Sequence, residues 1–143
     1  MTNLRPRSER AQGMVEFALA LPLLLLMMLG LFDFGRAIYA FNTVSNAARV
    51  GTRVAIVDQT MADVRAAAVN EAVALNISPA DVDVLYLIDP AVPGSTCAPI
   101  RIGCVAIVTV PYDFQPATPL IERLVGDITV SATSAQRIER SNP

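Results

Sequence analysis

Glu16 is the residue whose type and position most clearly suggest a chemical role. It is a carboxylate at the start of a long apolar run, FALALPLLLLMMLGLF, which occupies positions 17 to 32. A carboxylate driven to the middle of a bilayer would cost up to ~3 kcal/mol. Glu16 can be an interfacial residue without a role, or its charge can be compensated. If the chain were cut between Ala11 and Gln12, the new α-amino group of Gln12 would lie one helical turn from Glu16, on the same face.

Cys97 and Cys104 are the other residues whose types and spacing suggest a chemical role. They bracket a short loop, CAPIRIGC. If this part of the chain lies outside the cytoplasm, they can form a disulfide, which would contribute on the order of 2 to 3 kcal/mol by closing the loop. Two free thiols and a transient redox pair are the alternatives. Two cysteines without histidine are too few for a zinc site.

The sequence offers no set of residues for catalysis. Histidine is absent, which removes the commonest general base and a common metal ligand. Asp81, Asp83 and Asp89 do not follow calcium-loop spacing and are expected to line a solvated edge. No nucleophile–base pair, phosphate loop or nucleotide fingerprint occurs. We therefore expect a protein that is not an enzyme, with no catalytic residue, metal, cofactor or small-molecule substrate.

The charged residues also argue against nucleic acid as a partner. The net charge is −2, and every basic residue is an arginine. No basic cluster follows the first ten residues, so the electrostatic footprint of a nucleic-acid-binding surface is missing.

The apolar run itself predicts a transmembrane helix over residues 12–34. Counted back to Met14 it has 19 positions, interrupted only by Glu16. As a helix these would span roughly 28 Å, close to the thickness of the hydrocarbon core, and would contact membrane lipid. A buried core helix is the alternative, but a surface that is apolar all round would need more protein around it than this chain supplies.

The residues on either side of this helix predict its orientation. Arg5, Arg7 and Arg10 precede it, and within about 15 residues after it only Arg36 follows. The bias places the N-terminus in the cytoplasm and the C-terminal part outside, in a single-pass protein of the cytoplasmic membrane. Signal-peptidase cleavage would require small residues just after the apolar core, where the sequence has DFGRAIYAF. The helix should therefore stay in the mature protein.

Four motifs in the first third of the chain carry a family resemblance. They are the EF pair at Glu16 and Phe17, the ALP tripeptide, the D-F-G-R step and the N-x-x-x-N-A-A-R run. Together they make residues 8 to 57 closely resemble the TadE-like family, minor pilins of the tight-adherence pilus. In that pattern Ala11 would be position −1, Gln12 position +1, Glu16 position +5 and Phe17 position +6.

The resemblance implies both processing and function. Residues 1–11 would be a leader removed by a membrane-embedded prepilin peptidase. Many relatives have Gly where this chain has Ala11, and a cut after Gly13 would leave Glu16 at position +3, out of register, so Ala11 is the expected site. The mature chain would be a minor pilin or pseudopilin, because it is too long for the short major pilin.

The partners implied are other pilin and pseudopilin subunits and the assembly platform of an adhesive pilus or a related secretion system, at the membrane or the cell surface. The alternative function is a membrane-anchored binding module that presents residues 58–143 to an extracellular ligand without polymerising.

Beyond the membrane the helix is expected to continue over residues 35–57. One face would be polar, with Asn42, Asn46, Arg49 and Arg53 at helical spacing. The opposite face would pack on the protein's own domain through Ala37, Phe41, Val44, Ala48, Gly51 and Ala55.

Residues 58–143 are expected to form an extracytoplasmic α+β domain. Thr60 and Asp63 resemble a capping box before a helix over residues 61 to 75. Strands are predicted at 82 to 89, 103 to 114 and 128 to 140, with a short helical turn before the last. A meander of about three antiparallel strands packed on the long helix would give a pilin-like fold.

Overall fold

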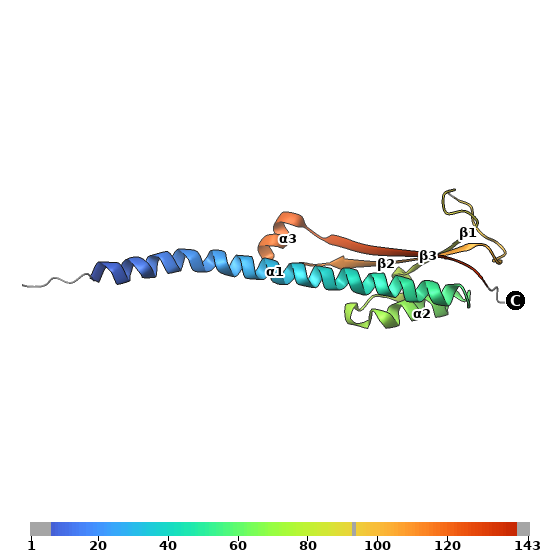
Figure 1. Cartoon of the computed structure of the whole chain (residues 1–143), viewed down its shortest axis with the longest axis horizontal. Helices are drawn as coiled ribbons and strands as arrows, with labels where there is room; N and C mark the ends of the chain where they lie inside the picture. The colour runs from blue at the N-terminus through green and yellow to red at the C-terminus, as the bar shows by residue number, and fades with distance from the viewer. Residues whose placement is uncertain (1–6, 93, 140–143) are drawn as a thin grey trace, which may run out of the picture.

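Helix α1, Arg7–Ala55, dominates the computed structural model, which describes residues 7–92 and 94–139. Its 49 residues correspond to a length of roughly 73 Å. Figure 1 shows that the first half of α1 stands free, whereas all other elements gather around its second half. The predicted continuation of one helix from the apolar run into the domain is confirmed.

The apolar segment, residues 14–32, is covered by almost nothing. Met14, Leu23 and Met27 are each more than 70% exposed. The helix is long and apolar enough to cross a membrane, and no part of its most apolar stretch is buried. A core helix of a soluble protein would be mostly buried, so that alternative does not hold for this segment.

The second half of α1 has the two faces that its sequence predicts. Asn42, Asn46, Arg49 and Arg53 are all exposed. The packed face is made of small and β-branched side chains: Ala40, Val44, Ala47, Ala48, Thr52 and Ala55. The prediction was wrong for Phe41, which is 53% exposed, because Ala40, one residue earlier, occupies the packed side at that level of the helix.

Helix α2, Met61–Glu71, runs beside α1 and is followed by two short 3-10 turns, Val73–Leu75 and Pro79–Asp81. Val64 and Ala68 are its buried residues. Thr60 is the N-cap as predicted, but its side chain makes no capping hydrogen bond. Instead the Asp58 carboxylate accepts a hydrogen bond from the Thr60 backbone N–H at 2.9 Å.

Two pKa values are shifted near the turn between α1 and α2, those of Asp58 and Tyr86. The hydrogen bonds from Thr60 hold the pKa of Asp58 below its usual value. Burial, with a smaller effect from the Asp58 charge, raises the pKa of Tyr86 above its usual value. The turn between the two helices is therefore fixed by an ionised carboxylate.

The sheet is a three-stranded antiparallel meander in the order β1-β2-β3. Its strands are β1, Asp83–Leu87, β2, Val105–Phe114, and β3, Ile128–Arg137. Helix α3, Pro119–Val125, lies between β2 and β3. The predicted α+β class and strand order are confirmed, with strand ends within three residues of the expected ones where the chain is described; residue 140 lies outside the described residues.

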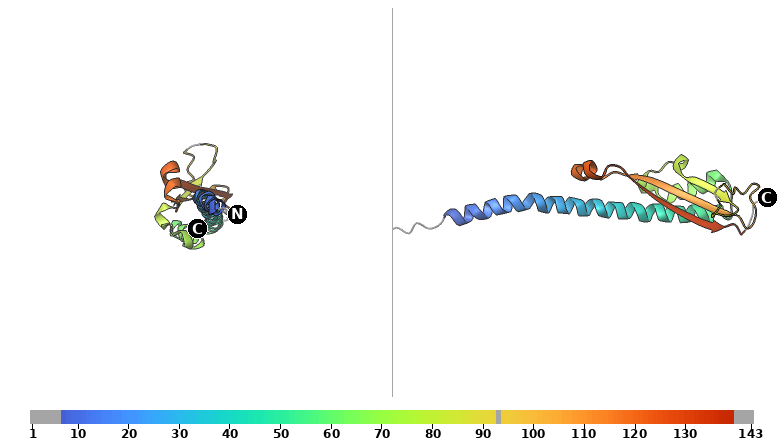
Figure 2. Two further views of the ribbon diagram at one scale, coloured as in Figure 1. Left: turned by 90° about the vertical axis from the view of Figure 1, so that its left-hand side faces the viewer. Right: turned by 90° about the horizontal axis from the view of Figure 1, so that it is seen from above.

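The core lies where one face of the sheet meets α1 and α2 (Figures 1 and 2). Along the first part of β2 every second residue is buried: Ala106, Val108 and Val110 have no exposed surface, whereas Tyr112 is half-buried. Small residues let α1, α2 and the sheet approach one another closely. A Cβ atom on Gly51 would lie 3.1 Å from the Ala68 Cβ and 3.1 Å from the Val108 Cγ1.

Candidate functional site

Gln12 and Glu16 lie on one face of α1, as their spacing predicts. Both side chains are exposed, and the Gln12 Nε2 donates a hydrogen bond to the Glu16 Oε1 at 3.4 Å. Ala11 is also exposed, and the bond between Ala11 and Gln12 lies in helical backbone. Glu16 therefore has a polar neighbour one turn before it and the apolar segment directly after it.

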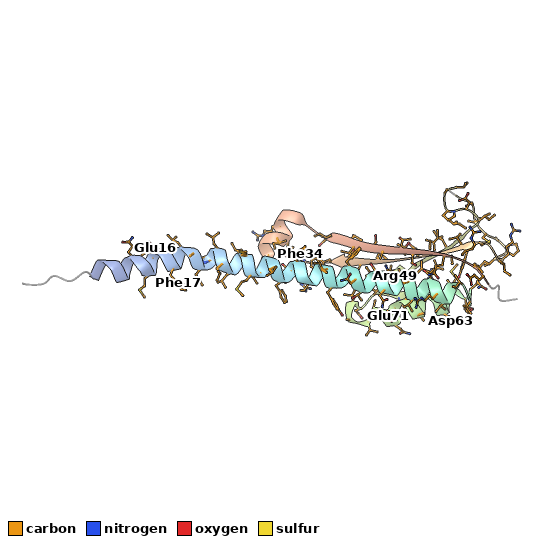
Figure 3. All side chains as sticks on the ribbon, in the orientation of Figure 1. Glu16, Phe17, Phe34, Arg49, Asp63 and Glu71 are labelled. Carbon is orange, nitrogen blue, oxygen red and sulfur yellow. A yellow bond between two sulfur atoms is a disulfide. The ribbon has the colours of Figure 1, made fainter. Side chains whose placement is uncertain are left out.

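Phe17 lies on the free part of α1, at a distance from the protein's own domain. Its side chain is 65% exposed, and Figure 3 shows it below the helix, with Glu16 above. Nothing among the described residues packs on this first part of α1, so both residues of the EF pair are available to lipid or to another chain.

Asp33, at the other end of the apolar segment, is a buried carboxylate that the sequence did not single out as a site. Only 3% of its surface is exposed. Its Oδ1 accepts a hydrogen bond from the backbone N–H of Ala117 at 2.9 Å, and its Oδ2 accepts one from Thr118 at 3.0 Å. Both donors belong to the connection between β2 and α3, far along the chain.

Arg36 completes this contact. Its Nη1 lies 3.5 Å from the Asp33 Oδ1 and also donates a long hydrogen bond, 3.5 Å, to the Gln115 carbonyl oxygen. The guanidinium carbon sits 5.4 Å from the centre of the Phe114 ring, a cation–π geometry. Asp33 and Arg36 are the first and last residues of the D-F-G-R step. Opposite charges three residues apart, just after an apolar run, were the signal available in the sequence.

Helix α3 is held next to this contact. The Ile121 Cδ1 would lie 3.8 Å from a Cβ atom on Gly30. Between α3 and α1 there is a cleft with a volume of about 230 Å³. Its lining is apolar except for Asp33, and consists of Gly30, Asp33, Phe34, Ala37, Phe114, Pro116, Ile121 and Ile128.

Another motif residue, Asn46, joins the two helices of the domain. Its side-chain amide donates a hydrogen bond to the Glu71 carboxylate of α2. Arg49 and Glu71 are labelled in Figure 3, which shows them at the level where α2 runs beside α1. This part of the N-x-x-x-N-A-A-R run therefore serves the packing of the domain.

Cys97 and Cys104 lie within disulfide-bonding distance of each other, with their Cα atoms 6.2 Å apart. Both are buried at the edge of the core, next to β1 and β2. The Cys97 N–H donates to the Tyr86 carbonyl oxygen at 2.8 Å, which fixes the loop against β1. The predicted pairing is thus geometrically satisfied.

The comparisons with known proteins agree with the motifs. The model of the family described as TadE-like protein matches residues 11–53. A search of curated proteins found no match to the chain. A search of solved structures also found none.

The family match begins at Ala11 and ends two residues before the end of α1. It includes Gln12, Glu16 and Phe17, as well as Asp33, Arg36 and Asn46. Both the free half of α1 and the residues that tie its second half to the domain are thus within the matched segment. Residues 11–53 of this chain match the model of the TadE-like family, the family that the sequence motifs predict.

Proposed function

We propose that this protein is a minor pilin or pseudopilin that takes part in the assembly of a tight-adherence pilus. The match to the TadE-like family suggests a pilin-like protein associated with that pilus. In the proposed arrangement residues 12–34 anchor the chain in the cytoplasmic membrane, with the N-terminus in the cytoplasm. Residues 35–57 continue the helix outside, and residues 58–143 complete the extracytoplasmic domain.

The observation that carries the proposal is the position of Glu16 on the free half of α1. Gln12 lies one turn before Glu16 on the same exposed face. If a prepilin peptidase removes residues 1–11, the positive α-amino group of Gln12 takes the place of the leader. The Glu16 carboxylate can then compensate that charge, within one subunit or between neighbours, and the attraction is strengthened where water is scarce.

The exposed apolar surface supports a role in assembly. Residues 14–32 present large side chains on all sides of the helix, and the domain covers hardly any of them. Such a surface is stable in lipid or against other apolar helices. Other pilin and pseudopilin subunits and the assembly platform are the proposed protein partners.

N-terminal sequencing of the mature protein, isolated from cells that contain a prepilin peptidase, tests the proposal. We expect the sequence to start at Gln12, because only this cut leaves Glu16 four residues after the new terminus. A start at Met14 would move Glu16 out of register with the proposed amine. A start at Met1, or beyond Phe32, would contradict processing as a pilin.

A further inference from the structure

Helix α3 projects sideways from α1 at the outer end of the apolar segment. Figure 1 shows it at the point where the free half of α1 meets the domain, and Figure 2 shows it displaced from α1 in a second direction. The sheet begins beyond it. Because α3 is the element of the domain nearest to the apolar segment, its level relative to a membrane follows from that segment.

The distance between the carboxylates of Glu16 and Asp33 determines where α3 lies relative to the membrane. Glu16 and Asp33 are 17 positions apart in one helix, which corresponds to a rise of roughly 25 Å. The hydrocarbon core of a bilayer is about 30 Å thick, so an apolar stretch of this length is slightly short. Asp33 is therefore drawn to the boundary of the hydrocarbon.

The surroundings of Asp33 allow it to lie at that boundary. Two backbone N–H groups, at 2.9 and 3.0 Å, and the Arg36 guanidinium at 3.5 Å satisfy its carboxylate without water. The same contacts hold the start of α3 at this level. A buried polar group that is fully hydrogen-bonded avoids most of the cost of losing water.

Ile121 of α3 lies closer than Asp33 to the middle of the apolar segment. It approaches Gly30, which precedes Asp33 by almost one helical turn on α1. The sequence of α3, PLIERLV, places a charged pair, Glu122 and Arg123, between two apolar pairs. Glu122 and Arg123 are exposed. A short helix with apolar and charged residues, oriented across the anchor, is suited to the interface between headgroups and acyl chains.

We propose that α3 rests in the outer interface of the membrane, and that the cleft between α3 and α1 takes up phospholipid acyl chains. This inference rests on the membrane anchoring in the proposed function. Lipid is the occupant because the cleft is continuous with the apolar segment, through Gly30 and Phe34, at the same level. Phe34 is 63% exposed and Ile128 is 37% exposed, so the domain itself leaves this surface open.

Single-tryptophan reporters test the proposal cleanly, because the chain contains no tryptophan. The full chain would be reconstituted into phosphatidylcholine vesicles whose acyl chains carry bromine either near the headgroup or near the chain end. Ile121→Trp is the principal reporter. Ile128→Trp, in the lining of the same cleft, is a second one in case the first substitution disturbs α3.

Two further reporters serve as matched controls. Leu24→Trp lies in the middle of the apolar segment, where the protein's own domain leaves Leu24 57% exposed, and Ile102→Trp lies at the far end of the domain, where Ile102 is 64% exposed. We expect bromine near the headgroup to remove roughly half of the Ile121→Trp fluorescence, because an interfacial helix lies at that depth. The Leu24→Trp reporter should respond most to bromine near the chain end, and the Ile102→Trp reporter to neither.

Each result decides between named alternatives. Quenching of the Leu24→Trp reporter without quenching at positions 121 and 128 would overturn the placement of α3 and leave the anchor intact. Absence of quenching at position 24 as well would contradict the membrane anchoring itself. Reporters at 121 and 128 that lipid does not quench, but that are shielded from iodide, would replace lipid by a neighbouring protein chain as the occupant.

Discussion

The carboxylate of Asp33 accepts a hydrogen bond from the backbone N–H of Thr118 at 3.0 Å, although the two residues are 85 positions apart in the chain. The contact joins the C-terminal end of the apolar segment to the connection between β2 and α3. It gives the D-F-G-R step a structural role, because the first residue of the step holds the domain against the end of the apolar segment.

Asp33→Ala should loosen this connection without unfolding the sheet. The change removes both acceptors of the Ala117 and Thr118 N–H groups and the partner of Arg36. We expect faster amide hydrogen exchange over residues 115 to 125, measured by mass spectrometry, and unchanged exchange in the central part of β2.

Asp127→Asn is the matched control for that experiment. Asp127 is an exposed carboxylate just after α3, so the variant should exchange like the parent. Equal exchange over residues 115 to 125 in the Asp33→Ala variant and the parent would show that Asp33 does not hold the connection.

Gly51→Ala should destabilise the domain. The added Cβ would lie 3.1 Å from Ala68 of α2 and from Val108 of β2, so packed neighbours on two elements must move, at a cost of about 1 to 3 kcal/mol.

Gly35→Ala is the matched control on the same helix, because a Cβ there meets nothing within 4 Å. It should leave stability unchanged or raise it slightly, since alanine favours the helix. Thermal unfolding followed by far-UV circular dichroism in detergent micelles measures both. Equal melting temperatures for the two variants would contradict the close packing at Gly51.

Glu16→Gln should separate processing from assembly. The substitution keeps the size of the side chain and its hydrogen-bonding capacity but removes the charge. Leader cleavage and membrane insertion should continue, while co-purification with other pilus components and surface piliation should fall. Glu139→Gln removes a charge from an exposed position in the domain and should assemble like the parent. If Glu16→Gln is processed and assembled normally, Glu16 is only an interfacial residue, and a membrane-anchored binding module becomes the better description.

Cys97 and Cys104 should be oxidised to each other in the native compartment, because the proposed topology places them outside the cytoplasm. Alkylation under non-reducing conditions followed by mass spectrometry should find neither thiol free. The Cys97→Ser/Cys104→Ser double variant should lose about 2 to 3 kcal/mol of stability, because the open loop gains freedom in the unfolded chain. Two fully alkylated cysteines in the native protein would argue against both the bridge and the topology.

Local patterns in the sequence were sufficient to predict most of the fold. The apolar run and the spacing of Asn46 and Arg49 predicted one long helix and its polar face, and the alternation at the start of residues 82 to 89 predicted the strand β1. Gln12 and Glu16 could be placed on one face because they are four residues apart. Each of these signals depends only on the period of a helix or a strand.

The role of Asp33 could not be predicted in the same way. Its partners at Ala117 and Thr118 are brought to it by the whole sheet, and no local period connects them. The sequence therefore showed a charged pair after the apolar run but not that Asp33 was buried. Phe41 illustrates the same limit, because helical spacing fixes which residues share a face but not how far the domain extends over that face.

The continuity of α1 has a consequence for azimuth, the direction in which the sheet faces around the anchor axis. A single helix passes from Glu16 to the packed residues of the domain, so turning the anchor also turns the sheet. One residue inserted between Phe32 and Asp33 would rotate everything beyond it by about 100° relative to Glu16, and move it by about 1.5 Å along the axis. In the proposed assembly, the contacts that a subunit makes inside the membrane would therefore also decide which side of its domain faces the neighbouring subunit.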